Sequence, residues 1–161
     1  MQKLVTMLLV SSEILARPGE PLVLHLDDVA SKMLEACKLS QAGKQAAKNC
    51  GLTEQQFEQL TYVTGWCHDF GKATPYFQDY LKTHKRTQKS QHSLLGAWAS
   101  MQLFQEDSKE ARLCRTLAFY AIRHHHSPFH NKDEALEIEG DEDFSYESYR
   151  QMPEAKKLKL Q

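Results

Sequence analysis

Apolar residues recur at helical spacing along most of this chain, whereas the strict alternation of a β-strand is scarce. This periodicity restricts the fold class more than any other feature of the sequence. Helices are predicted over residues 25–39, 53–71, 74–81, 92–104 and 108–126. With 161 residues, of which 41% are hydrophobic, the chain can bury one sizeable core. The sequence therefore predicts a single all-α domain.

Several helix starts carry recognisable signals. Thr53 and Gln56 have the spacing of a capping box, Ser108 is an N-cap candidate, and Pro75 suits a first helical position. In the segment "HSLLGAWASMQLF" the predicted core side consists of Leu94, Leu95, Trp98 and Met101.

Composition changes after His130, where the chain runs from acidic to basic with few large aliphatic residues. We therefore predict a compact core over residues 1–130, followed by residues 131–161 as a polar, mobile tail or a truncated continuation.

Charge and cysteine content exclude some classes of protein. The net charge is −1, so nucleic-acid binding would need a local basic patch or a partner protein. The four cysteines form no C-x-x-C pair, which argues against a zinc knuckle and a disulfide framework and favours reduced core thiols. No apolar run reaches membrane-spanning length, and a cytoplasmic location is expected.

Histidines gather at the predicted helix ends. The chain has eight, and those at or near helix ends are His25, His68, His92, His124, His125 and His126. Because neutral imidazole binds transition metals and a carboxylate can bridge two ions, Asp69 beside these histidines predicts a dinuclear centre. The alternative is that each histidine is a hydrogen-bonded helix-end residue, the role we assign to His84 and His130.

Four segments carry a family resemblance. "HDFGKATPYFQDYL" resembles the signature of the HD phosphohydrolase superfamily, and its form with Lys72 and Phe77-Gln78 is similar to the HD nuclease domain of type I CRISPR systems. "ILARPGEPLVLHLDDVASKM", "QHSLLGAW" and "AIRHHHSPF" resemble further segments of that family, in the same order. The resemblance implies a helical HD bundle with a metal site at converging helix ends.

The resemblance also implies roles for individual residues. One ion would be held by His25, His68 and Asp69, and Asp69 would be shared with a second ion held by His92, His125 and His126. His124 stays open as a substitute for one of the paired ligands. Asp69 and Lys72 would be catalytic, with Lys72 neutralising the scissile phosphate or the carboxylate, and Ser93 would support the ligands.

One family feature has no match here, namely an aspartate on a late helix that completes the first ion's shell. Asp133, Asp141 and Asp143 have the right chemistry but lie in the polar tail. The chain is therefore expected to be a fragment or to have an open first site.

The implied function is metal-dependent cleavage of single-stranded DNA in CRISPR interference, together with a helicase and the CRISPR surveillance complex. His-rich ligation favours manganese, iron, cobalt or nickel, with magnesium as the alternative. Two other functions stay open: an HD phosphohydrolase acting on small nucleotides, and a non-catalytic helical module.

Overall fold

The computed structural model of the chain describes residues 13–126. Its elements are β1 (Leu15–Arg17), β2 (Glu20–Pro21), α2 (Leu22–Leu39), α3 (Gln41–Asn49), α4 (Glu54–Cys67), η1 (Phe70–Ala73), α5 (Pro75–Thr83), η2 (Gln88–Ser90), α6 (Ser93–Met101) and α7 (Lys109–Arg123). Apart from the short β1–β2 hairpin, the regular structure in this range is helical, which confirms the predicted all-α class.

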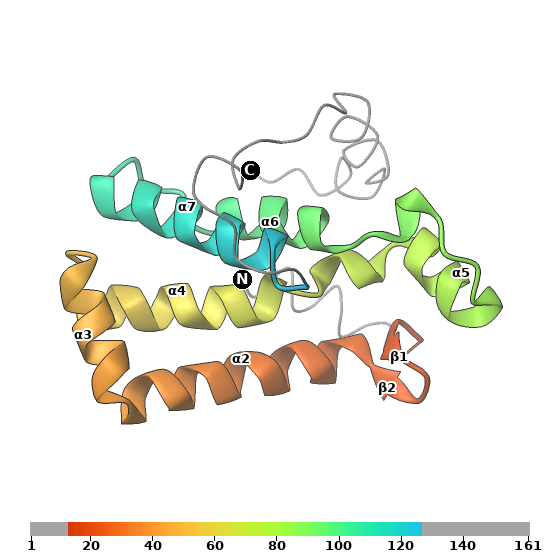
Figure 1. Cartoon of the computed structure of the whole chain (residues 1–161), viewed down its shortest axis with the longest axis horizontal. Helices are drawn as coiled ribbons and strands as arrows, with labels where there is room; N and C mark the ends of the chain where they lie inside the picture. Colours follow the sequence, from red (N-terminus) through yellow and green to blue (C-terminus); the bar gives the residue numbers. More distant parts are fainter. Residues whose placement is uncertain (1–12, 127–161) are drawn as a thin grey trace.

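Helix α4 lies in the middle of the bundle, with α2 packed on one side and α6 and α7 on the other (Figure 1). Helices α2 and α6 begin at the end of the bundle where α4 and α7 finish, and α5 projects beyond this end (Figure 1). Because α2 and α6 run in the opposite direction to α4 and α7, two helix starts and two helix ends lie together. The predicted histidine ligands lie at these four termini.

The helix starts have the predicted caps. The Thr53 hydroxyl accepts a hydrogen bond from the Gln56 backbone N–H, and the Gln56 side chain accepts one from the Thr53 N–H. Ser108 accepts from the Ala111 N–H, and Pro75 occupies the first turn of α5. These caps satisfy backbone donors that the helix itself leaves unpaired, and so set where each helix begins.

Some element boundaries differ from the prediction. Helix α4 ends at Cys67 rather than Gly71, because the backbone leaves helical geometry at Asp69, with φ −110° and ψ 10°, and continues as the tight helix η1. Helix α2 begins at Leu22, three residues before the predicted start. Helix α3 and the β1–β2 hairpin were not predicted. Helix α3 is mostly polar, and Ala47 is its buried residue. Strands β1 and β2 are too short to show an alternation of apolar and polar residues.

The core consists of two clusters on opposite sides of α4. The cluster against α6 and α7 includes Leu60, Val63, Ala97, Cys114, Ala118 and Ile122. The cluster against α2 and β1 is Ala16, Leu22, Leu26, Ala30 and Trp66. Cys67 and Cys114 are free buried thiols, and burial raises the pKa of Cys67 to about 12. Such a thiol stays protonated and unreactive near neutral pH.

Trp98 does not belong to the buried side of α6, contrary to the prediction. Its side chain is 39% exposed, and its ring packs edge-on against Phe119 of α7 at 5.5 Å between centroids. Leu94 and Leu95 are buried as predicted.

Two glycines allow the start of α6 to lie close to the end of α4 and to η1. A Cβ atom at Gly96 would collide with the carbonyl oxygen of Cys67, and one at Gly71 would collide with the backbone of His92. Because neither clash can be relieved by rotating a side chain, only glycine lets the start of α6 lie against the end of α4. This contact places His92 beside His68 and Asp69.

Within residues 13–126 the structure has no helix with the length and apolar character needed to cross a lipid bilayer. His130, Asp133, Asp141 and Asp143 lie outside the described residues, as does the whole segment 131–161. The division into a core over residues 1–130 and a tail after it stays a prediction.

Candidate metal centre

The structure brings all six predicted ligand residues to one place. His25 lies in the first turn of α2, His68 caps α4, Asp69 follows it, and His92 caps the start of α6. His125 and His126 come directly after α7. Asp69 is buried and lies at the centre of the group.

One oxygen of Asp69 faces His25 and His68. The Oδ2 atom lies 3.0 Å from His25 Nε2 and 3.3 Å from His68 Nε2, and the two Nε2 atoms are 3.3 Å apart. Their ligand atoms all lie within 4.8 Å of one another, so these three residues could hold one ion.

The other oxygen of Asp69 faces the remaining histidines. The Oδ1 atom lies 2.9 Å from His92 Nε2 and 3.4 Å from His125 Nε2, and His126 Nε2 lies 3.0 Å from His92 Nε2. These four residues form a second possible metal group. The two oxygens of a single carboxylate thus point into two separate groups of imidazoles.

Backbone contacts fix which ring nitrogen faces the centre. The Nδ1 atom of His68 lies 2.6 Å from the Gly65 carbonyl oxygen, and the Nδ1 atom of His125 lies 2.6 Å from the Ile122 carbonyl oxygen. A carbonyl oxygen only accepts hydrogen bonds, so each Nδ1 carries the proton and donates. When the ring is neutral, Nε2 carries the lone pair that a metal ion needs; when the ring is protonated, Nε2 donates to Asp69 instead.

Unsatisfied atoms at the centre are the structural evidence that a cation fits. Asp69 Oδ1 and His125 Nε2 are buried, and although Oδ1 lies 2.9 Å from His92 Nε2, neither atom makes a hydrogen bond of acceptable geometry among the described residues. Such groups are costly to bury unless something pairs with them. Two ligand atoms, each about 2.1 Å from one ion and at right angles, lie about 3.0 Å apart. The distances between neighbouring candidate ligand atoms in this centre are 2.9–3.4 Å, which is close to that spacing.

The electrostatics favour the metal-binding protonation states of Asp69 and His126. Burial favours the neutral form of Asp69, but the imidazoles of His125, His68 and His92 and the ammonium of Lys72 outweigh it and hold the pKa of Asp69 well below its usual range. Burial, with smaller contributions from His125 and His92, lowers the pKa of His126. Asp69 is therefore ionised, and the neutral form of the His126 imidazole is favoured beside it.

Lys72 lies at the edge of the centre. Its ammonium nitrogen is 2.7 Å from Asp69 Oδ2, and it lies 5.4 Å from the centroid of the Phe77 ring. The buried Phe77 ring also packs edge-on against His92, with centroids 5.1 Å apart. Phe77 thus supports both a ligand histidine and the one lysine that contacts Asp69 in the described part of the chain.

Sequence reasoning missed two residues that position the site. Glu20 Oε2 lies 3.5 Å from His25 Nδ1 and 2.7 Å from Arg17 Nε, so this carboxylate sits behind a ligand histidine. The Gln78 amide accepts from the Leu15 N–H and donates to the carbonyl oxygens of Leu15 and Lys72. Both residues occur in the segments that carry the resemblance, but only the folded hairpin shows what they contact.

His124, Ser93 and His84 take other places. His124 caps α7 and its ring packs against Tyr120 at 5.0 Å, so His125 and His126 rather than His124 join the group around Asp69. Ser93 begins α6 beside His92, and its supporting role stays a prediction. His84 is exposed at the end of α5, outside both metal groups.

Glu20→Gln is expected to weaken metal binding by about 10–100-fold, the usual cost of losing the residue behind a metal-ligating histidine. The neutral amide would favour the His25 ring less strongly in the orientation that presents Nε2. Calorimetric titration with Mn²⁺ measures the change. The exposed Glu13→Gln makes the same chemical change outside the site and should bind as the wild type does. Equal affinities for the two variants would show that Glu20 has no positioning role.

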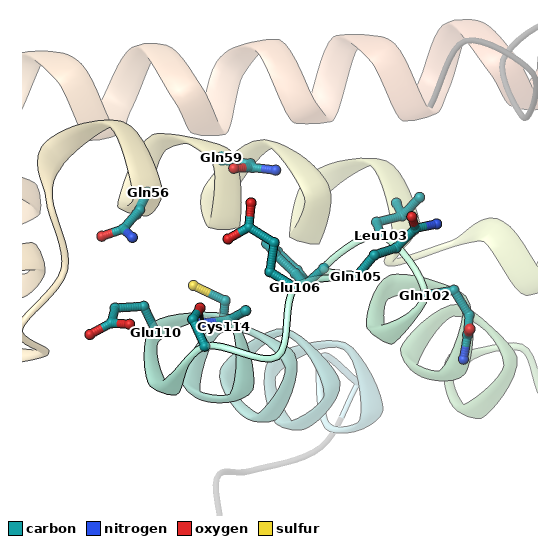
Figure 2. A pocket seen from close by; sticks show the side chains of 11 residues that line it. Gln56, Gln59, Gln102, Leu103, Gln105, Glu106, Glu110 and Cys114 are labelled. Carbon is teal, nitrogen blue, oxygen red and sulfur yellow. Dashed lines mark hydrogen bonds between the residues drawn. The ribbon is translucent and has the colours of Figure 1, made fainter.

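A pocket of about 440 Å³ lies at the opposite end of the bundle. Figure 2 shows Gln56 and Gln59 of α4 across from Glu110 and Cys114 of α7, with Glu106 on the connecting loop. None of the candidate metal ligands lines this pocket. The group around Asp69 is therefore a cluster of ligands at helix termini, separate from this cavity.

Comparison with known proteins agrees with this geometry. Residues 15–159 match the family model described as "Cas3, HD domain". No curated protein and no solved structure matches the chain. The family match covers most of the chain, including every candidate ligand in the described range. The chain belongs to the family of Cas3 HD domains, which are metal-dependent nuclease-type hydrolase domains of CRISPR systems.

Proposed function

We propose that this chain cuts the phosphodiester backbone of single-stranded DNA at the Asp69 centre, together with a helicase and the CRISPR surveillance complex. The observation that carries the proposal is the arrangement of one buried carboxylate with an oxygen facing each of two imidazole groups. His25, His68 and Asp69 would hold one divalent ion, and Asp69, His92, His125 and His126 a second. Manganese, iron, cobalt and nickel suit these nitrogen-rich ligands better than magnesium does.

Divalent ions bound here would supply a nucleophile near neutral pH and charge stabilisation for the phosphate. The chain's own residues have distinct tasks. The backbone carbonyl oxygens of Gly65 and Ile122 keep two imidazoles oriented, and Asp69 shares its charge between the two groups. Lys72 places an ammonium beside the carboxylate, where it can neutralise a phosphate oxygen that enters the site.

The form of the site supports a polymer substrate over a small nucleotide. His126 is exposed, so the centre opens to solvent on that side. A nucleotide phosphohydrolase needs an enclosed pocket for the base and the sugar. The pocket in Figure 2 and a smaller one between α2, α3 and α4 both lack the candidate ligands in their linings. A single strand, which bends more easily than a duplex, can bring one phosphate to helix ends.

The test incubates the full chain with each candidate metal and with single-stranded DNA, duplex DNA or free nucleotides. We expect metal-dependent cleavage of the single strand in preference to the duplex, and no cleavage in excess chelator. Rapid nucleotide hydrolysis without DNA cleavage would instead identify a nucleotide phosphohydrolase. If the protein neither took up metal nor hydrolysed any substrate, the helical module without catalysis would be the correct description.

A further inference from the structure

The hairpin formed by α5, η2 and the loop between them, residues 75–90, carries a basic surface next to the metal centre. We call this segment the α5 arm. It projects from the end of the bundle where the ligands converge (Figure 1). Lys82, Lys85, Arg86 and Lys89 are all exposed, and no acidic residue occurs between Tyr80 and His92.

Three of these cations have no carboxylate partner in the described part of the chain. Within residues 13–126 the structure gives no ion pair to Lys82, Lys85 or Arg86. Elsewhere on the bundle, by contrast, Lys32 pairs with Asp28 and Arg112 pairs with Asp107. Asp79, three residues before Lys82, is the one acidic residue of the arm, so the cations of the arm outnumber its carboxylates and attract a polyanion.

An exposed aromatic ring connects this surface to the centre. Tyr76 is 39% exposed, and the Lys89 ammonium lies 5.5 Å from its ring centroid. The next residue along the chain, Phe77, packs against His92 and lies under Lys72. A cation therefore lies over an exposed aromatic ring, one residue from the wall of the metal centre. Proteins that bind single strands combine these two features.

The opposite end of the bundle carries charges of both signs. Glu54, Glu106 and Asp107 are exposed where α4 and α7 begin. Lys44, Lys48 and Lys109 are exposed at the same end, so the carboxylates there lie among cations, whereas Asp79 is the one acidic residue among residues 75–90. A nucleic acid would be attracted to the α5 arm more than to the pocket in Figure 2, whose lining includes Glu106 and Glu110.

We propose that the α5 arm is a binding surface for single-stranded DNA that guides the strand to Asp69, an inference that rests on the proposed function. Lys82, Lys85 and Arg86 contact backbone phosphates, and Tyr76 stacks on an unpaired base. The arm reads no sequence, since phosphates and aromatic stacking accept every base.

The test measures binding separately from cleavage. The full-length test variant carries Lys82→Ser, Lys85→Ser and Arg86→Ser. Its affinity for a fluorescent oligothymidylate is measured by anisotropy at several salt concentrations, with chelator present so that no cut occurs. Each lost phosphate contact lowers the slope of log affinity against log salt by about 0.7 for a single strand, so we expect a slope shallower by about 2.

The control removes the same charge from the far end of the bundle. It carries Lys44→Ser, Lys48→Ser and Lys109→Ser, three exposed residues of α3 and α7. We expect its salt slope and affinity to match the wild type. Equal losses in the two triple variants would overturn the proposal, because general charge rather than the α5 arm would then control binding.

Tyr76 tests the aromatic contact. Tyr76→Ala is expected to weaken oligothymidylate binding by about tenfold, within the range known for the loss of one stacked base, and Tyr76→Phe should restore it. In a cleavage assay the loss should appear in KM rather than in kcat, since the ring lies outside the ligand group. A Tyr76→Phe variant as weak as Tyr76→Ala would contradict stacking.

The outcomes separate this proposal from the proposed function. Weakened binding by the α5-arm variants, in a protein that shows no metal-dependent cleavage, would support the surface and refute the nuclease assignment. Wild-type binding by these variants, in a protein that cleaves DNA, would refute the surface alone. In that case a protein partner would be the better candidate for the arm.

Discussion

Asp69→Asn is expected to lower metal-dependent DNA cleavage by at least about a thousandfold, because several kcal/mol of transition-state stabilisation by the metals depend on this residue. Asparagine keeps the shape of the side chain, but it loses the charge and replaces one of the two ligand oxygens with an NH₂ group. Both imidazole groups would lose their shared anion. Initial rates on single-stranded DNA at saturating metal measure the effect.

The matched control for this change is Asp28→Asn, which removes an exposed carboxylate of α2 that pairs only with Lys32 in the described range. It should retain wild-type cleavage, and both variants should keep the helical circular dichroism of the wild type. Wild-type turnover by Asp69→Asn would refute the assignment of Asp69 as the shared ligand.

The two halves of the centre are expected to bind metal with different affinities. The group of Asp69, His92, His125 and His126 offers three imidazoles, whereas the group of His25, His68 and Asp69 offers two. Titration with Mn²⁺ should therefore show a tighter and a weaker event. His125→Ala should weaken the tighter event, and His25→Ala the weaker one, each by at least about a hundredfold, since residues behind a ligand alone change affinity by about 10–100-fold.

His84→Asn controls for the loss of a histidine. His84 is exposed and has a φ of 57°, a conformation that asparagine tolerates, so this variant should show both events unchanged. Two equally tight events in the wild type would contradict the unequal ligand sets. Such a result would indicate a further ligand beyond residue 126, and Asp133, Asp141 and Asp143 would be the first to mutate.

The sequence predicted the parts of the fold that depend on local patterns. Helical periodicity identified α4, α6 and α7, and the Thr53 and Ser108 caps set where two of them begin. Histidines at helix ends predicted one shared metal centre, and the antiparallel helices bring the end of one to the start of the next. The choice of His125 and His126 over His124 came from the family resemblance, and the structure places those two near Asp69.

Contacts that depend on distant segments could not be predicted in this way. Glu20 reaches His25 only because β1 and β2 form a hairpin too short to show alternation. Gln78 holds Leu15 across 63 positions of sequence, which no local rule anticipates. Trp98 has the spacing of a core residue, but α6 turns it toward Phe119 at the surface.

Anomalous scattering from crystals grown with Mn²⁺ tests the central claim most directly. We expect one peak bounded by Asp69 Oδ1, His92, His125 and His126, and a weaker one bounded by Asp69 Oδ2, His25 and His68, both lost after treatment with chelator. If the crystals took up manganese without a peak next to Asp69, the convergence of these residues would be structural and the metal-centred account of this site would be wrong.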